Sequence, residues 1–142
     1  MKALNTVKIT FPSRSVNEGF ARSALSAFAA QADPTLDELA DVKTAVSEAV
    51  TNCIVHAYAN TIGPITLTAA LYEDGTLRVA VADKGCGIPD VSKAMEPLFT
   101  TKEDCERAGM GFSFMEAFMD DLEVESAPGE GTLVRMKKKL GI

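Results

Sequence analysis

The segment from residue 39 to residue 58 constrains the fold most, because it carries two patterns that only a helix can separate. Glu48, Asn52 and His56 stand four residues apart, which places them along one helix face. A second set, apolar and spaced by three or four residues, falls on a different stripe: Leu39, Val42, Val46, Ala49, Cys53 and Ala57. We therefore expect a long helix with an apolar side and a side that carries chemistry.

Length and composition restrict the class of protein. With 142 residues, 46% of them hydrophobic, the chain can bury one core, and we expect one domain over residues 1–142. Its net charge of -6 disfavours binding to nucleic acid or to an anionic membrane. Three cysteines without CxxC spacing suggest neither disulfides nor a zinc site, and no apolar run is long enough to span a bilayer. These features predict a soluble, cytoplasmic protein.

Short-range patterns predict the order of the elements. Residues 6–11 alternate as a half-buried strand, and residues 17–31 form a helix. The apolar stripe of that helix is expected to contain Phe20, Ala24, Ala27 and Phe28. Either Asp33 or Thr35 caps the long helix that follows.

The second half of the chain is mostly strands. Alternating apolar residues predict strands over 65–72 and 77–83, joined by a hairpin turn at residues 73–75. Residues 85–111 are expected to be mostly loop with a short helical turn, of the length typical of functional lids. A short helix over 112–119 and strands near 122–125 and 132–140 complete the chain. This order predicts an α+β two-layer sandwich, with a mixed or antiparallel sheet covered by helices on one face.

Three glycine motifs are candidate ligand sites. Asp83 follows a strand and precedes Gly85 and Gly87, so its carboxylate could accept a hydrogen bond from an amine such as that of adenine, or could simply cap a turn. Residues 109–111 precede an expected helix and could bind a polyphosphate through free amides, or could be a plain helix start. Residues 129–132 form a further glycine-rich turn, which needs no ligand to explain it.

The helix face with Glu48 and Asn52 offers a metal ligand and a base. An amide oxygen from Asn52, together with phosphate oxygens, would hold Mg²⁺, which keeps several waters. Glu48, one turn away, could accept the proton of an attacking hydroxyl. The alternative is a solvated helix face. His56 could make a structural hydrogen bond or bind a ligand, and we leave it out of the catalytic set.

Taken together and in this order, ExxxN, DxGxG, GxG and GxGT resemble the N, G1, G2 and G3 boxes of the GHKL ATP-binding superfamily, over residues 7–140. That superfamily includes gyrase, heat-shock protein 90, MutL and histidine kinases. Four further stretches look like its anti-sigma factor and serine kinase branch: residues 47–52, 83–90, 97–102 and 106–112. Two details depart from the usual pattern. Met110 departs from the GLGL form that is usual in sensor kinases, and a cysteine between the two G1 glycines, here Cys86, is unusual.

The resemblance implies a Bergerat fold that binds ATP or ADP with Mg²⁺ and forms a homodimer. It also implies binding of a sporulation sigma factor and phosphorylation of a serine on a STAS-type anti-anti-sigma partner. Asn52 would be the Mg²⁺ ligand, Glu48 the catalytic base and Asp83 the residue that recognises adenine. Further nucleotide-binding residues would be Gly85, Gly87, Thr100, Thr101, Lys102, Arg107, Gly109, Met110, Gly111 and Thr132. Arg22, outside the expected apolar stripe, would contact both protein partners.

Two alternatives stay open. One is a non-catalytic module that uses nucleotide as a structural ligand; the presence of Glu48 argues against it, because binding alone needs no base. The other is the isolated ATPase domain of a sensor kinase. Against this, the sole histidine lies in the ATP-site helix, and we expect no preceding dimerisation helix with a phosphoacceptor.

Overall fold

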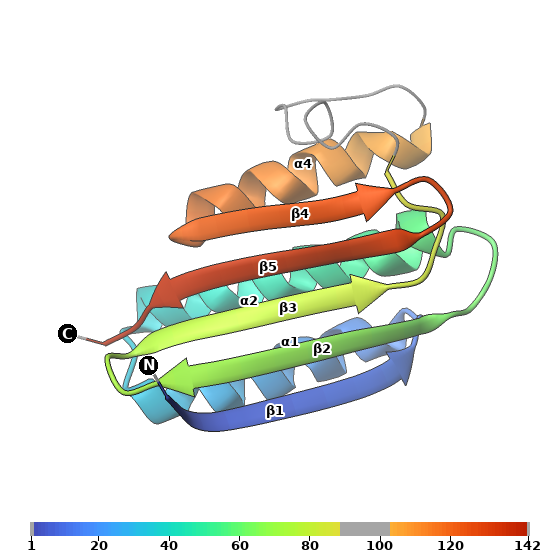
Figure 1. The fold of residues 1–142 in the computed structure, drawn as a ribbon. Coiled ribbons are helices and arrows are strands. Elements are labelled where there is room, and N and C mark those ends of the chain that lie inside the picture. The colour runs from blue at the N-terminus through green and yellow to red at the C-terminus, as the bar shows by residue number, and fades with distance from the viewer. Residues whose placement is uncertain (1, 89–102, 142) are drawn as a thin grey trace.

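The computed structural model describes residues 2–88 and 103–141, and of residues 103–110 it describes the backbone alone. Strands and helices follow the predicted order (Figure 1). Their bounds are β1 (Ala3–Pro12), α1 (Val16–Ala29), the 3₁₀ turn η1 (Ala30–Ala32), α2 (Leu36–Asn52), the π-helical turn η2 (Cys53–Ala57), β2 (Pro64–Tyr72), β3 (Thr76–Asp83), α4 (Glu103–Phe118), β4 (Asp121–Ala127) and β5 (Gly131–Lys139). In the described residues, no helix is long and apolar enough to cross a bilayer.

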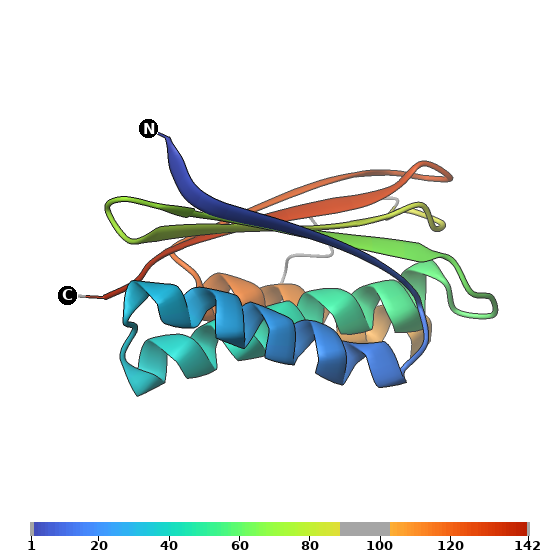
Figure 2. The same ribbon diagram turned by 90° about the horizontal axis from the view of Figure 1, so that it is seen from below.

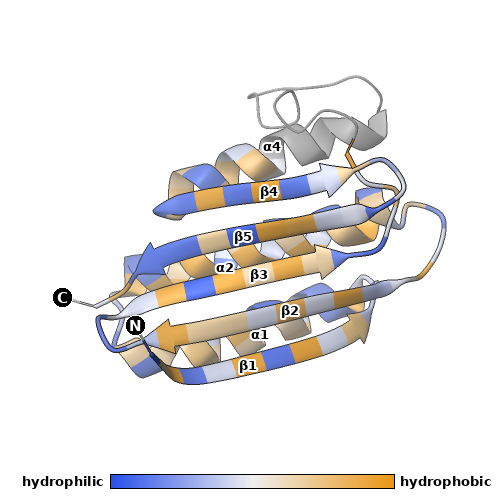
Figure 3. Ribbon diagram, in the orientation of Figure 1, coloured by the Kyte–Doolittle hydropathy of each residue, from blue (hydrophilic) through white to orange (hydrophobic). Residues whose placement is uncertain are grey.

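The five described strands form one sheet in the order β1-β2-β3-β5-β4, and every neighbouring pair is antiparallel. The described α-helices α1, α2 and α4 cover the same face of this sheet (Figure 2). The strands alternate apolar and polar residues, as a sheet covered on one side requires (Figure 3). Asp83 pairs with Ile65 on one side and with Thr132 on the other. The two-layer α+β prediction is confirmed, and this register brings residues from three strands to one end of the sheet.

The core lies between the helices and the sheet. The predicted apolar stripe of α2 is confirmed, with Val42 and Val46 fully buried. The stripe predicted for α1 is confirmed at Phe28, which is buried, and is wrong at Ala27, which is exposed, and at Phe20, which is 53% exposed. The side of α1 that packs on the core consists of Ala21, Leu25, Phe28 and Ala29. Phe20 instead meets the edge of the Phe11 ring at the margin of the core, with centroids 6.5 Å apart.

Of the two predicted caps for α2, Thr35 is confirmed. Its hydroxyl accepts a hydrogen bond from the Glu38 amide at 3.1 Å, and the Glu38 carboxylate accepts one from the Thr35 amide at 2.8 Å. The same carboxylate accepts a hydrogen bond from the Gly141 amide at 3.1 Å. Hydrogen bonding from the Thr35 amide is the largest influence that lowers the pKa of Glu38. Asp33 has φ of 50° and ends η1 instead.

Helix α4 begins earlier than predicted. The expected helix over 112–119 is the second half of an α4 that starts at Glu103, so Gly109 and Gly111 lie inside it. Glycine costs about 1 kcal/mol in a helix interior, which is why the sequence pattern favoured a loop there. Phe112, Met115 and Met119 are buried at the spacing of a helix face, and this packing fixes the end of α4 against the core.

Candidate nucleotide-binding site

A small cavity of about 50 Å³ lies where the end of α2, the end of β3 and the start of β5 meet. The predicted site residues Asn52, Asp83, Gly87 and Thr132 all line it, as does His56. The remaining lining residues are Ala49, Cys53, Ala57, Cys86, Ile88, Phe112 and Val134. The structure thus brings together motifs that are far apart in the sequence.

The last turn of the long helix is a π turn. The amide of Tyr58 donates to the Cys53 carbonyl, five residues earlier, at 3.0 Å. Turns of this kind are rare and frequently occur at functional sites. The Tyr58 hydroxyl accepts a hydrogen bond from the Lys84 amide at 2.6 Å and donates to the Pro64 carbonyl at 2.7 Å. Tyr58 therefore fixes the end of the helix to the residues that follow β3.

Asp83 is the buried acidic residue of the site. Its Oδ1 accepts hydrogen bonds from the amides of Gly85, at 2.9 Å, and Thr132, at 3.2 Å. Its Oδ2 accepts one from the thiol of Cys53 at 3.4 Å. A carboxylate oxygen has two lone-pair positions, so Oδ2 can accept a further hydrogen bond from a ligand. Recognition of a ligand amine by Asp83 stays a prediction.

Gly87 lines the cavity, and Gly131 directly precedes Thr132, which also lines it. Both glycines have positive φ, 76° and 83°. A Cβ on Gly87 would collide with the Ala127 carbonyl oxygen, and one on Gly131 with the Asp83 carbonyl oxygen. These positions need glycine because two loops approach each other closely, before any ligand is considered.

Ser126 joins these two loops, although the sequence analysis did not identify it. Its hydroxyl accepts a hydrogen bond from the Ile88 amide at 2.8 Å and lies 2.8 Å from the Thr132 hydroxyl. The Gly129 amide adds a bond to the Cys86 carbonyl at 2.7 Å. The G1 and G3 segments are therefore one hydrogen-bonded unit. Nothing in the sequence pattern marks Ser126 as its link.

Glu48 and Asn52 lie beneath α4. A Cβ on Gly111 would come within 3.0 Å of Asn52 Nδ2 and 3.3 Å of Glu48 Oε2, so any side chain there would require these two groups to shift by a few tenths of an ångström. Asn52 Nδ2 is buried and has no hydrogen-bond partner among the described residues. Buried polar groups without partners are rare in native proteins and call for an explanation such as a ligand.

These residues fit a nucleotide with Mg²⁺. In the described residues, no group of three or more His, Cys, Asp or Glu side chains could hold a metal ion. A Mg²⁺ ion here would depend on the amide oxygen of Asn52, phosphate oxygens and water, which is a common arrangement for this ion. The cavity itself must widen, since about 50 Å³ holds only a few water molecules.

The other predicted residues are distributed as follows. Arg107, Gly109 and Met110 belong to α4, where the structure describes the backbone alone. Thr100, Thr101 and Lys102 lie outside the described residues. Arg22 is on the outer side of α1, where its guanidinium pairs with Glu18 at 3.2 Å.

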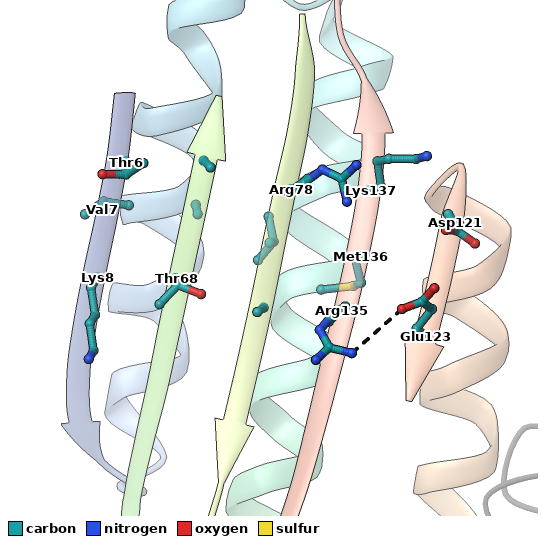
Figure 4. Close-up of a pocket in the computed structure, with 14 residues that line it drawn as sticks. Thr6, Val7, Lys8, Thr68, Arg78, Asp121, Glu123, Arg135, Met136 and Lys137 are labelled. Carbon is teal, nitrogen blue, oxygen red and sulfur yellow. Dashed lines mark ion pairs between the residues drawn. The ribbon is translucent and has the colours of Figure 1, made fainter. Parts of the chain in front are cut away.

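A larger hollow, of about 400 Å³, lies on the face of the sheet that bears no helix (Figure 4). Its lining is mixed in charge. Lys8, Arg78 and Lys137 carry positive charge, whereas Asp121 and Glu123 lie on the edge strand β4. Arg135 bridges to Glu123 at 3.8 Å and to Glu125 at 2.9 Å. None of the predicted nucleotide-site residues lines this hollow.

The fold and the site define a class of protein. The sequence pattern of the histidine kinase-like ATPase domain matches residues 11–138, and the chain belongs to this family. The fold resembles the RsbU and RsbW domains of a Mycobacterium tuberculosis protein, with a TM-score of 0.70 and 24% identity over 96% of this chain and 32% of that one. It also resembles the histidine kinase domain of a blue-light activated kinase from Erythrobacter litoralis, with a TM-score of 0.57 and 20% identity over 87% and 61% of the two chains.

Full-length relatives narrow the class to the anti-sigma F factors. The anti-sigma F factor of Caldanaerobacter subterraneus is 60% identical over 99% of this chain and 98% of its own length. The anti-sigma F factor of Clostridium acetobutylicum is 51% identical over 97% and 96% of the two chains. These matches confirm the suspected branch of the superfamily. An ATPase domain of this class binds nucleotide.

Proposed function

We propose that this chain is a nucleotide-dependent anti-sigma factor that also acts as a serine kinase. It binds and inhibits a sporulation sigma factor, and it phosphorylates a serine on a STAS-type anti-anti-sigma protein, which inactivates that protein. One observation carries the proposal: Asn52 on α2 and Asp83 at the end of β3 line one cavity, and Glu48 lies with Asn52 beneath Gly111, in a chain 60% identical to an anti-sigma F factor. Residues 1–142 act as one cytoplasmic domain.

The nucleotide is ATP or ADP with Mg²⁺. Asp83 accepts a hydrogen bond from the adenine amine through Oδ2, because its Oδ1 already accepts two amide bonds. Asn52 supplies an oxygen ligand to Mg²⁺, and Gly85, Gly87 and Thr132 belong to the wall and hydrogen bonds that hold Asp83 in place.

Glu48 acts as the base of phosphoryl transfer. Its carboxylate takes the proton of the partner's serine hydroxyl while that oxygen forms a bond to the γ-phosphorus, and ADP leaves. The position of Glu48 one turn before Asn52 supports this role, because it places the base beside the residue that would hold the metal ion.

Nucleotide entry requires movement of α4. Gly111 lies against Asn52 and Glu48, and Phe112 lines the narrow cavity. Inside a helix the amides of residues 109–111 donate hydrogen bonds to carbonyl oxygens four residues earlier, so these amides cannot also bind phosphate. We infer that the first turns of α4 rearrange on binding, so that residues 100–102, Arg107 and residues 109–111 contact the phosphates and phosphate oxygens replace the helical partners of these amides.

Arg22 is the proposed contact for both protein partners. It lines a groove of about 240 Å³ between α1 and α2, together with Lys43, Thr44 and Ser47. Two cations and two hydroxyls suit an acidic side chain of a partner. The groove shares no lining residue with the nucleotide cavity, so partner binding can be tested separately.

We also propose that two copies of the chain form a homodimer. A twofold interface must be complementary to itself. The helix-free face of the sheet has basic side chains in its middle and acidic ones along β4, which supports this arrangement. Light scattering of the purified chain at several concentrations tests it, and a monomer at all of them would reject it.

Phosphoryl transfer provides the decisive experiment. The purified chain is incubated with Mg²⁺, γ-labelled ATP and a STAS-type anti-anti-sigma protein, and label on the partner is measured. We expect Glu48→Gln to slow labelling about a hundredfold or more while it preserves ATP binding. Glu73→Gln is the matched control, because Glu73 is an exposed residue between β2 and β3; it should label the partner normally.

The possible failures have different meanings. If the unaltered chain binds ATP but transfers no label, it is a nucleotide-dependent binding module. If Glu48→Gln transfers normally, Glu48 is not the base. If the chain binds no adenine nucleotide, the proposed function fails as a whole.

A further inference from the structure

The thiol of Cys53 is the one side-chain donor to Asp83 among the described residues. Cys53 follows Asn52 directly, begins the π turn and is 4% exposed. Its Sγ donates to Asp83 Oδ2 at 3.4 Å across a sequence separation of 30 residues. Cys86 lines the same cavity, but its thiol lies near the carbonyl oxygens of His56 and Gly87 instead. The two thiols therefore have different partners and can be compared.

The two oxygens of Asp83 are held in different ways. Oδ1 is fixed by the backbone amides of Gly85 and Thr132, which no side-chain substitution removes. Oδ2, the oxygen left for a ligand, has only the thiol of Cys53 as a donor among the described residues. Loss of that thiol would leave Oδ2 free to tilt away from its present direction. Cys53 thus controls the direction of the remaining lone pair.

The environment of Cys53 keeps the thiol in the donor form. Burial raises the pKa of this thiol well above its ordinary value, and the neighbouring charge of Asp83 raises the pKa further. At neutral pH the group therefore carries its proton. The same burial separates it from reagents in solvent, which favours a positioning role over a reactive one.

We propose that Cys53 is a positioning residue that orients Asp83 Oδ2 toward the exocyclic amine of adenine, and so contributes to selection of adenine over hypoxanthine. This inference rests on the proposed nucleotide function. Hypoxanthine carries a carbonyl where adenine carries the amine, and a carboxylate can only accept hydrogen bonds. A substitution that weakens binding through this contact must therefore lower the affinity for adenine nucleotides more than the affinity for inosine nucleotides.

The test compares ADP and inosine diphosphate by titration calorimetry on the full chain. Cys53→Ala should weaken ADP binding about three- to tenfold, the range of one modest hydrogen bond, and change inosine diphosphate binding less than twofold. Cys53→Ser retains a donor and should restore ADP affinity to within about twofold. In the Asp83→Asn background, Cys53→Ala should cause no further loss of ADP affinity. Cys86→Ala should leave the ratio of the two affinities unchanged.

Several results would overturn the inference. Equal losses for both nucleotides in Cys53→Ala would show that the residue only shapes the cavity. A serine variant no better than alanine, in a chain whose melting curve shows normal folding, would exclude the donor role, as would unchanged ADP affinity in Cys53→Ala. If the unaltered chain binds neither nucleotide, the proposed function fails instead, which is a separate outcome.

Discussion

Replacing Asp83 with asparagine tests the centre of the proposed site. The two backbone amides from Gly85 and Thr132 would still find an oxygen at Oδ1. The new NH₂ group would occupy the place of Oδ2, where it would face the thiol proton of Cys53 and the amine of the ligand. The acceptor Oδ2 would thus be replaced by a donor group that faces two other donors, the thiol and the amine. The charge of the acceptor would be lost as well.

The size of the effect follows from these contacts. A hydrogen bond to a charged group contributes about 1.5 to 3 kcal/mol. Each 1.4 kcal/mol is about tenfold in affinity, so ADP should bind roughly 10- to 150-fold more weakly to Asp83→Asn. Stability should change less, because both amide bonds remain and the lost partner is a weak thiol donor. We expect the melting temperature to fall by no more than about 4 °C.

Titration calorimetry with ADP measures the affinity, and a melting curve establishes that the variant is folded. Inosine diphosphate is the control ligand, since it lacks the amine; the Asp83→Asn variant should discriminate less between the two nucleotides. A folded variant with unchanged ADP affinity would show that Asp83 does not recognise adenine. The glycine turns would then be structural features only.

Three further predictions concern other parts of the molecule. Arg22→Ala should weaken binding of both the sigma factor and the anti-anti-sigma protein while ATP affinity stays intact, whereas Arg14→Ala, the exposed control, should retain both partners in a pull-down. Thr35→Ala removes the cap of α2 and should lower the free energy of unfolding by about 1 kcal/mol in denaturant titrations. Because the pKa of Glu38 is lowered in the folded state, its stabilising effect is present above its unfolded pKa and is lost as pH falls through its folded value. Thr35→Ala keeps the amide at residue 35 that donates to Glu38, so the free energy of unfolding should fall in acid in both the unaltered chain and this variant. Residues 97–108 should exchange amide hydrogens more slowly with ATP bound, and equal rates in both states would reject their role as a lid.

Local sequence patterns determine the parts of the fold that could be predicted from the sequence. The apolar stripe of α2, the hairpin at residues 73–75 and the cap at Thr35 each depend on residues within a few positions of one another. Phe20 was misplaced because the stripe of α1 is set by which side faces the sheet, and a shift of one residue rotates a helix by about 100°. Only the packed layers determine that choice.

The start of α4 was missed for a related reason. Glycine, present at residues 109 and 111, has the lowest helix propensity of any residue but proline, so the local pattern predicts a helix that begins only after them. Yet Gly111 lies where α4 passes over Asn52, and a Cβ there would come within 3.0 Å of Asn52 Nδ2. A glycine that looks like a helix breaker thus permits close packing between two helices.

The candidate site shows the same division between local and long-range information. The motifs identified Asp83 and Asn52. The contacts of Cys53, Ser126 and Tyr58 depend on how the π turn and the ends of β3, β4 and β5 come together in the fold. Sequence separation hides such contacts, since the thiol of Cys53 reaches a carboxylate 30 residues away.

The glycines of the G1 and G3 segments fit both the structural and the functional interpretation of these motifs. Residues 87 and 131 must be glycine because the backbone at each position closely approaches a carbonyl oxygen of the opposite loop. That close approach lets the Thr132 amide reach Asp83 and the Gly129 amide reach Cys86. A turn that looks merely structural therefore holds the acceptor oxygen in the direction a ligand would need. Evidence that a glycine is needed for packing is consequently no evidence against a nucleotide site, because here the packing builds the site.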